Sequence, residues 1–239
     1  MRRDGDTGDR RYRTRPVAVV YSDDATGPAD GDDTSAVAAM LAAAAGWDFE
    51  VITAGPNGMM PVREALAHPG VRLYAQPGAS GDDHAAYKRQ KRDRSAIRKF
   101  VHRGGRYLGI CMGGFLAESC FFDLFRGRVD EYYSSPGAAV KTPDPAVIPI
   151  IWRGTTRRMY FQDGGYMVPK RSTSNGVTVL ARYSNGSVAA LVAPCGRGKV
   201  GLCGPHPEAP REWYRKAGLV YRGPTQDLGD DLIDALMAP

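Results

Sequence analysis

The segment Arg106-Tyr-Leu-Gly-Ile-Cys-Met-Gly-Gly-Phe-Leu116 is the part of this 239-residue chain from which the fold can be predicted. Tyr107 to Ile110 is a short apolar run, which is typical of a buried strand in a parallel sheet. Cys111 follows directly, between Gly109 and Gly113. The segment therefore predicts a strand, a sharp turn centred on a cysteine, and the start of a helix.

The pattern Gly-x-Cys-x-Gly is typical of a nucleophile elbow with cysteine in place of serine. The turn is so sharp that the residues two before and two after the nucleophile must lack a bulky side chain. It would lift the sulfur above the sheet, at the N-terminus of a helix running from Met112 towards Ser119, where free N–H groups and the helix dipole favour a thiolate. We therefore expect Cys111 to be a nucleophile. The alternative is a buried structural cysteine, as free cysteines often are.

A nucleophilic thiol needs a base, and the segment Val200-Gly-Leu-Cys-Gly-Pro-His-Pro-Glu-Ala209 supplies a candidate. A short apolar strand leads to His206, and Glu208 follows two residues later. An imidazole can accept the thiol proton, and a carboxylate can orient the imidazole and stabilise its charge. The candidate catalytic residues are therefore Cys111, His206 and Glu208. A structural role for His206 is the alternative interpretation.

The elbow together with the late His-Pro-Glu resembles the class I glutamine amidotransferase-like superfamily. The stretch from Gly104 to Ala117 is similar to the biotin-protein ligase N-terminal domain family. Further stretches with the same similarity are Gln76-Pro-Gly78, Tyr160-Phe-Gln-Asp-Gly-Gly165 and Gly198 to Glu208. The resemblance runs from about Pro16 to about Trp213.

This resemblance implies an oxyanion hole and a substrate pocket. Backbone N–H groups of Gly78 or Ala79 and of Met112 would form the oxyanion hole. Glutamine amidotransferases usually carry a glutamine at the position of Phe115, and an aromatic residue there is in keeping with the biotin-ligase-like subfamily. The resemblance also implies that the loop from Glu131 to Pro145 shapes the pocket. The expected pocket residues are Gly113, Gly114, Phe115 and Tyr133.

The pattern of elements predicts the fold class. Apolar strands at 17–21, 49–53, 71–75 and 107–110 alternate with helices at about 33–45, 61–68 and 87–103, which indicates a parallel sheet covered on both faces. The second half reads as strands at 147–152, 158–162, 177–183, 187–192 and 199–203, with Asn185-Gly186 as a hairpin turn. Helices are expected at about 207–217 and 227–237. Together with the resemblance, this predicts a flavodoxin-like, doubly wound α/β fold with a mainly parallel sheet and an added β-hairpin region.

Length and composition bear on the number of domains, on metal or cofactor content and on the cellular compartment. The length suits one domain, which we expect at 16–239 after a disordered, charged tail at 1–15. The four cysteines show no ligand-like spacing, so we expect no metal, no cofactor and a reducing cytoplasm. No stretch is long and apolar enough to be read as a membrane span.

The stretch from Lys88 to Arg103 holds eight lysines and arginines and one aspartate, whereas the whole chain has a net charge of +6. A solvated helix face explains this charge, and so would a surface for nucleic acid or an acidic partner. We do not expect a nucleic-acid partner, because aromatic residues are not interleaved with the basic ones.

Three functions remain open on the sequence. The first is a cysteine-dependent amidase, hydrolase or acyl-transfer enzyme acting on a small amide or acyl substrate, with a partner enzyme chain if ammonia or an acyl group is passed on. The second is a non-catalytic ligand-binding or regulatory domain related to the biotin-protein ligase N-terminal domain. The third is a protein that binds through its basic surface. The sequence does not specify the oligomeric state.

Overall fold

The computed structural model describes residues 15–26, 32–171 and 175–239. The expected tail at 1–15 therefore lies outside the described residues, apart from Arg15. The Arg15 guanidinium forms an ion pair with Asp48 at 2.6 Å. Within the described ranges, no helix is both long enough and apolar enough to cross a bilayer.

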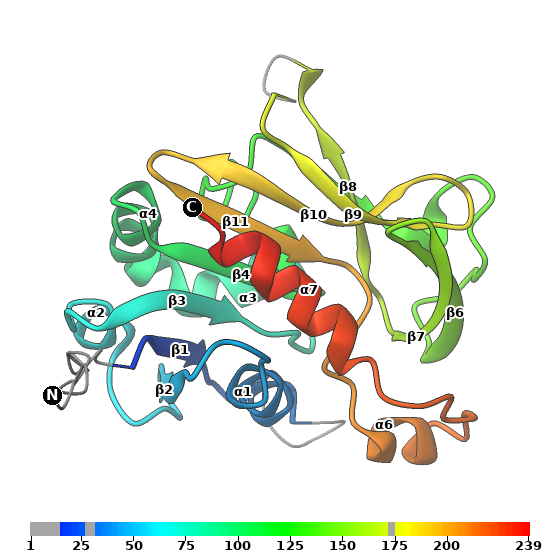
Figure 1. The fold of residues 1–239 in the computed structure, drawn as a ribbon, viewed down its shortest axis with the longest axis horizontal. Coiled ribbons are helices and arrows are strands. Elements are labelled where there is room, and N and C mark those ends of the chain that lie inside the picture. Colours follow the sequence, from blue (N-terminus) through cyan, green and yellow to red (C-terminus); the bar gives the residue numbers. More distant parts are fainter. Residues whose placement is uncertain (1–14, 27–31, 172–174) are drawn as a thin grey trace, which may run out of the picture.

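Five parallel strands form the half of the sheet that carries the elbow (Figure 1). Their order across the sheet is β2-β1-β3-β4-β11, which is the flavodoxin-like order. Each neighbouring pair is parallel. The expected flavodoxin-like α/β fold is thus confirmed. These strands are β1 (Val17–Tyr21), β2 (Glu50–Ala54), β3 (Val71–Gln76), β4 (Arg106–Ile110) and β11 (Gly198–Cys203).

Helices cover both faces of this parallel region, because its strands bury both of their faces. In β1, Ala18 and Val20 belong to one core cluster, while Val17, Val19 and Tyr21 belong to a second. The first cluster includes residues of α1 and α7, and the second includes residues of α2 to α5. The helices are α1 (Asp33–Ala42), α2 (Val62–Ala65), α3 (Asp83–Gln90), α4 (Arg94–His102), α5 (Met112–Leu116), α6 (Arg211–Lys216) and α7 (Gln226–Met237).

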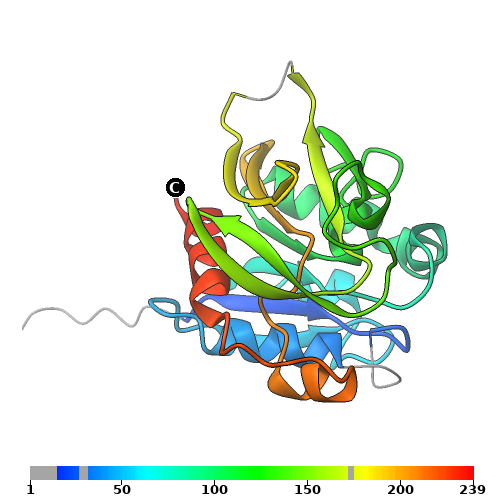
Figure 2. The same ribbon diagram turned by 90° about the vertical axis from the view of Figure 1, so that its right-hand side faces the viewer.

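The rest of the sheet is antiparallel and continues from β11 through β10, β9, β6 and β7. The turn between β9 and β10 lies at Asn185-Gly186, as the hairpin signal predicted, and Gly186 has a φ of +87°. The β6–β7 pair faces the viewer in Figure 2. The strands are β5 (Gly127–Glu131), β6 (Ala146–Trp152), β7 (Thr155–Phe161), β8 (Gly165–Pro169), β9 (Thr178–Tyr183) and β10 (Val188–Cys195).

The long helix expected at 87–103 is broken, which corrects the prediction. A 3-10 turn, η1 (Lys91–Asp93), separates α3 from α4. Asp93 is buried there, and its carboxylate pairs with Arg63 Nε at 3.3 Å. This ion pair holds Asp93 next to α2. The backbone bends at η1 as a result, so α3 and α4 are two helices instead of one.

The helix after the elbow is also shorter than expected, because α5 ends at Leu116 instead of continuing to Ser119. The backbone then turns back: Phe122 donates to the Leu116 carbonyl at 3.0 Å, and Leu124 donates to Ala117 at 2.9 Å. The Glu118 carboxylate accepts from the backbone N–H of Val129 at 2.6 Å. These bonds favour a loop over another helical turn. A second 3-10 turn, η2 (Tyr132–Ser134), follows β5.

Candidate active site

Cys111 lies in a strained turn between β4 and α5. Its φ is +50° and its ψ is −110°, in the left-handed range of φ that non-glycine residues rarely adopt. A Cβ on Gly109 would lie 2.4 Å from the Gly113 carbonyl oxygen, and a Cβ on Gly113 would lie 2.1 Å from the Gln76 oxygen. Only glycine fits at either position, which is the steric demand expected of the elbow.

Backbone carbonyls from the turn between β7 and β8 face the sulfur. The thiol of Cys111 donates to the Gln162 carbonyl at 3.4 Å and lies 3.8 Å from that of Asp163. Close packing holds this turn in place, because a Cβ on Gly164 would lie 2.3 Å from the Gly204 oxygen. The motif from Tyr160 to Gly165, noted in the sequence for its similarity alone, thus lies against the candidate nucleophile.

His206 lies directly after β11 and is held on both its backbone and its side chain. Its backbone N–H donates to the Tyr160 carbonyl at 3.0 Å, and its Nδ1 lies 2.8 Å from Glu208 Oε1. The side chains of His206 and Glu208 are 5% and 0% exposed. The rings of Tyr160 and Trp213 stand edge-on to the imidazole, with centroids 5.8 and 5.5 Å away.

The second ring nitrogen of His206 is available for chemistry. Among the described residues, buried Nε2 has no hydrogen-bond partner, and neither does Glu208 Oε2. Burial lowers the pKa of His206, but the charges of Glu208 and Cys111 raise it, and the net result is a pKa well above its ordinary value. The Cys111 N–H donates to the Cys203 carbonyl at 2.8 Å, which places the elbow beside the loop that carries His206. An imidazolium is therefore stabilised beside the sulfur.

The residues expected in the oxyanion hole come from two loops beside Cys111. Gly78 follows β3, and a Cβ added there would lie 3.3 Å from His206 Cε1. Ala79 is half-buried and packs against the second core cluster. Met112 is the first residue of α5, so its N–H has no partner within the helix. Gly78 and Met112 therefore flank Cys111 and His206.

Three of the expected pocket residues have other neighbours. Gly114 faces Val129, whose Cγ1 would lie 4.0 Å from an added Cβ. The Phe115 ring packs with the second core cluster and lies against Gly165. Tyr133 lies in η2, where Glu131 and Asp163 raise its pKa. Of the expected pocket residues, Gly113 is tied most closely to the elbow.

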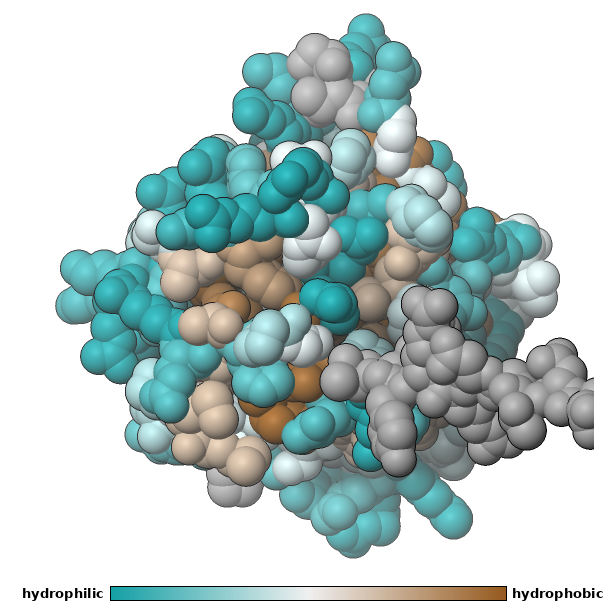
Figure 3. Space-filling view, turned by 60° about the vertical axis from the view of Figure 1, so that its left-hand side comes forward, coloured by the Kyte–Doolittle hydropathy of each residue, from teal (hydrophilic) through white to brown (hydrophobic). Residues whose placement is uncertain are grey.

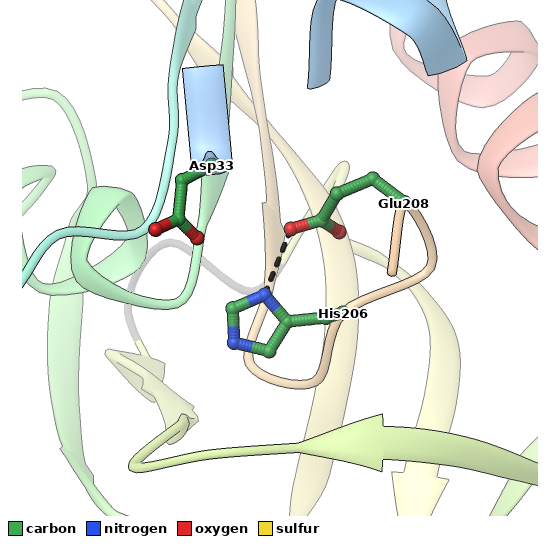
Figure 4. Close-up of side chains that lie close together, drawn as sticks. All are labelled: Asp33, His206 and Glu208. Carbon is green, nitrogen blue, oxygen red and sulfur yellow. Dashed lines mark hydrogen bonds and ion pairs between the residues drawn. The ribbon is translucent and has the colours of Figure 1, made fainter. Parts of the chain in front are cut away.

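Sequence reasoning missed Asp33, the first residue of α1. The helix expected at about 33–45 does begin at Asp33, but Asp32 is its cap and accepts from the Ser35 N–H at 2.8 Å. Asp33 instead lies beside His206 and Glu208, with one side-chain atom of each within 4.8 Å of the others (Figure 4). Burial raises the pKa of Asp33 to about 7. These three are the residues of this site that could hold a metal ion.

The basic segment lies outside this constellation. Lys91, Arg92, Arg94, Ser95, Arg98, Lys99 and His102 line a surface hollow along η1 and α4. The view of the side on which α2 and α4 lie shows a largely hydrophilic surface with apolar residues gathered towards its middle (Figure 3). The structure thus separates the charge-rich face from Cys111, which lies at the carboxyl end of β4.

Comparison with known proteins places this geometry in context. Residues 72–130 match the family model described as biotin-protein ligase, N terminal. A glutamine amidotransferase from Thermotoga maritima has a similar structure, with a TM-score of 0.59 and 11% identity over 94% of this chain and 99% of that one. A Thermoplasma acidophilum protein described as one of the subunits of GMP synthase gives a TM-score of 0.53 and 12% identity over 93% of both chains.

The same fold also occurs within a larger enzyme. A β-galactosidase from G. stearothermophilus gives a TM-score of 0.53 at 14% identity, and this chain spans 30% of its length. No curated protein matches the sequence. The chain thus has the class I glutamine amidotransferase-like fold, as the resemblance implied, and its central segment is similar to the biotin-protein ligase N-terminal family. Because fold alone does not define an activity, the chemistry must be argued from the site.

Proposed function

We propose that Cys111, His206 and Glu208 form the catalytic triad of a cysteine-dependent amidase, hydrolase or acyl-transfer enzyme acting on a small amide or acyl substrate. One observation carries the proposal. A cysteine held at positive φ lies beside the loop of a buried imidazole whose Nδ1 is bound to Glu208 and whose Nε2 has no partner among the described residues other than the Cys111 thiol. A structural histidine would normally have both nitrogens satisfied.

The proposed reaction begins with transfer of the Cys111 thiol proton to His206 Nε2. The thiolate attacks the carbonyl carbon and forms a C–S bond, and the carbonyl π electrons move to the oxygen. When the tetrahedral intermediate collapses, the C–N or C–O bond breaks and the leaving group takes the proton from the imidazolium. Water, deprotonated by His206, or another acceptor then cleaves the thioester and restores the thiol.

Glu208 would hold Nδ1 and stabilise the positive charge on the ring. Because Glu208 is fully buried, this interaction is little screened by solvent. The N–H groups of Met112 and of Gly78 or Ala79 would stabilise the oxyanion, and one such donor is typically worth about 3 kcal/mol in the transition state. If ammonia or an acyl group is passed on, a partner enzyme chain would receive it.

A second candidate function follows from the match of residues 72–130 to the biotin-protein ligase N-terminal model. The chain would then be a non-catalytic ligand-binding or regulatory domain that keeps the fold and the residues. This alternative predicts no special reactivity at Cys111, so one measurement separates the two candidates.

The test is the rate of iodoacetamide labelling at each cysteine between pH 5 and pH 9, followed by mass spectrometry. The other three cysteines are useful internal references, because burial raises the pKa of Cys120, of Cys195 to about 11, and of Cys203. We expect Cys111 alone to label fast near pH 6, and His206→Ala to abolish this fast labelling. His84→Ala, which removes an exposed imidazole, is the matched control and should change nothing.

Two results would count against a catalytic triad. One is labelling of Cys111 only at the pH expected of a free thiol, whose pKa is about 8.5. The other is fast labelling that survives His206→Ala. If Cys111 instead labels as expected, a screen of small amides and acyl esters would identify the reaction.

A further inference from the structure

Asp33 is a charged group for which the triad has no use. Glu208 already occupies Nδ1 of His206, yet Asp33 approaches the same imidazole from a different element, the start of α1 (Figure 4). A Cβ added to Gly78 would lie 2.6 Å from Asp33 Oδ1 and 3.3 Å from His206 Cε1. Asp33 therefore borders the same point of the site as the candidate oxyanion loop.

Within the described part of the chain, Asp33 and Glu208 share one neighbouring cation, the His206 imidazolium. Among the residues the structure describes, no lysine or arginine forms an ion pair with Asp33. Besides burial, the charges that act on its pKa are His206, which lowers it, and Glu208 and Asp32, which raise it. A half-buried carboxylate whose neighbouring imidazole is already paired with Glu208 is costly, so it is either protonated or paired with a charge that arrives from outside.

The backbone of one further acidic residue, Asp163, lies near the sulfur. The Asp163 backbone oxygen is 3.8 Å from Cys111 Sγ, and burial and the nearby Glu131 raise the pKa of the Asp163 side chain. The chain as a whole is basic, with 32 lysines and arginines against 26 acids. Asp33 and Glu208 therefore bring two carboxyl groups together in an otherwise basic protein.

Buried polar atoms at the same place have hydrogen-bonding capacity that the described residues do not use. Glu208 is 8% exposed, and its Oε2 lacks a hydrogen-bond partner within the described structure. Buried polar groups in native proteins are normally satisfied, and exceptions are common where a ligand binds. Asp33 is thus one of three polar side chains at a site with unused hydrogen-bonding capacity.

We propose that Asp33 binds a positively charged group of the substrate, so that the enzyme acts on an amide or acyl compound carrying an ammonium or guanidinium group near the scissile carbonyl. This inference rests on the proposed function, because it places the cation beside the carbonyl that Cys111 would attack. Binding of the cation would ionise Asp33 and compensate its buried charge.

The test uses thiol reagents that differ only in charge. Methanethiosulfonates react when the thiolate attacks the sulfenyl sulfur and a sulfinate leaves. Three reagents are compared at Cys111 at pH 8: a trimethylammonium-ethyl cation, a neutral ethyl reagent and a sulfonato-ethyl anion. Each rate is divided by the rate of the same reagent with a free cysteine peptide. We expect the cationic reagent to exceed the neutral one by about tenfold, as an ion pair at a partly buried site allows.

Asp33→Asn should reduce this preference at least fivefold while leaving the rate of the neutral reagent within about twofold, because only the charge is removed. Asp48→Asn is the matched control. Asp48 is an exposed acid just before β2, at the amino ends of the parallel strands and thus away from Cys111. Asp48→Asn removes the same charge from the chain and should leave the preference for the cationic reagent unchanged.

Wild-type protein gives a second readout that does not depend on the folding of a variant. All three reagents react with the same Cys111 thiolate, so the fraction of Cys111 that is ionised cancels from the ratio of their rates. The charges that face Asp33 are Asp32 on its own element and His206 and Glu208 from the loop after β11. Because the pKa of Asp33 is raised to about 7, the preference for the cation should be large above pH 7 and should fall below it.

The outcomes separate the two proposals. An absent preference in wild type, or one that persists in Asp33→Asn, overturns the role of Asp33. Equal slowing of all three reagents in Asp33→Asn also overturns it, because the carboxylate would then act only through His206. If His206→Ala leaves Cys111 reactivity unchanged, the triad fails instead, while the charge ratio still reports on Asp33.

Discussion

At the scale of the residue, His206 is the proposed base, and the direction of its pKa shift can be tested. The pKa of His206 is raised, so the imidazole keeps its proton as the pH rises through 6.5, the ordinary value. Glu208→Gln removes the negative charge at Nδ1 and should lower this pKa. We therefore predict that iodoacetamide labelling of Cys111 at pH 6 falls about tenfold or more, since an opposite charge shifts a pKa by about 1–3 units.

The control for this prediction is the rate of iodoacetamide labelling of Cys111 at alkaline pH. At pH 9 a thiolate forms without help from an imidazolium, so wild type and Glu208→Gln should label at similar rates there. Equal labelling at pH 6 would instead mean that Glu208 has no electrostatic role at His206.

The raised pKa of Asp33 leads to a second prediction at this scale, about how the free energy of unfolding depends on pH. The pKa of Asp33 is raised from 3.8 to about 7 in the folded state. The folded state therefore binds the proton more tightly, and this stabilising contribution is lost as the pH rises from about 4 through 7. Three pKa units at 1.36 kcal/mol each give an upper bound of about 4 kcal/mol.

The measurement is urea unfolding at pH 5 and pH 8.5. Wild type should lose more stability between these values than Asp33→Asn, which has no carboxyl to ionise, and Asp48→Asn should behave like wild type. If Asp33→Asn loses as much stability as wild type, Asp33 titrates near the value of an exposed aspartate.

Residues with a local chemical signature could be located from the sequence, and Asp33 could not. Cys111 has glycines at fixed offsets, and His206 and Glu208 are neighbours in the chain, so each reveals itself within a few residues. Asp33 is 173 positions from His206, and only the crossing of α1 over the sheet brings them together. Its sequence neighbourhood, Asp32 to Ser35, indicates a helix cap and nothing more, because Asp32 performs that role.

At the scale of the element, the elbow depends on Gly109 and Gly113, the two glycines that allow β4 to turn into α5. A Cβ on Gly113 would lie 2.1 Å from a backbone oxygen of Gln76, whereas one on Gly114 would meet nothing nearer than 4.0 Å. We predict that Gly113→Ala destabilises the protein by about 1–3 kcal/mol, as overpacking does. Gly114→Ala is the matched control and should stabilise the protein by about 0.5–1 kcal/mol, as alanine does in a helix.

Urea unfolding and the labelling rate of Cys111 test this pair of variants. Gly113→Ala should also slow labelling, because the Cys111 turn must shift to make room. Equal stabilities of the two variants would mean that the elbow can relax around a methyl group.

Elements with strong periodicity were predictable, and those defined by tertiary partners were not. β1 has the predicted bounds, and the Asn185-Gly186 turn lies where the hairpin signal placed it. β5 and β8 were missed because β5 has one apolar residue in its sequence GRVDE and β8 pairs mainly with β5. The break at η1 has no local signal, since burial of Asp93 against Arg63 decides it.

At the scale of the whole molecule, α7 joins the parallel region to the antiparallel one. Its inner residues pack on the parallel sheet, and its acids reach β6 and β7. Asp231 accepts from the Trp152 indole at 2.7 Å and from Arg153 at 3.0 Å. Trp152 is 3% exposed, so loss of Asp231 would leave a buried donor unpaired.

We predict that Asp231→Ala destabilises the protein by about 1–3 kcal/mol, the usual penalty for an unpaired buried group. Asp227→Ala breaks the more exposed pair with Arg157 and should cost about 0–1 kcal/mol. Urea unfolding of both variants distinguishes the two costs. Similar values for the two would show that water replaces Asp231 at the indole.

The edge-on contact between Trp213 and His206 has a spectroscopic consequence. Indole fluorescence is quenched by a protonated imidazole in contact with it, and the ring centroids here are 5.5 Å apart. The emission of Trp213 should therefore brighten as His206 loses its proton, and a ligand that displaces or neutralises the imidazolium should brighten it too. Trp213 would thus be an intrinsic optical reporter of the protonation of His206, which can follow ligand binding without any added label.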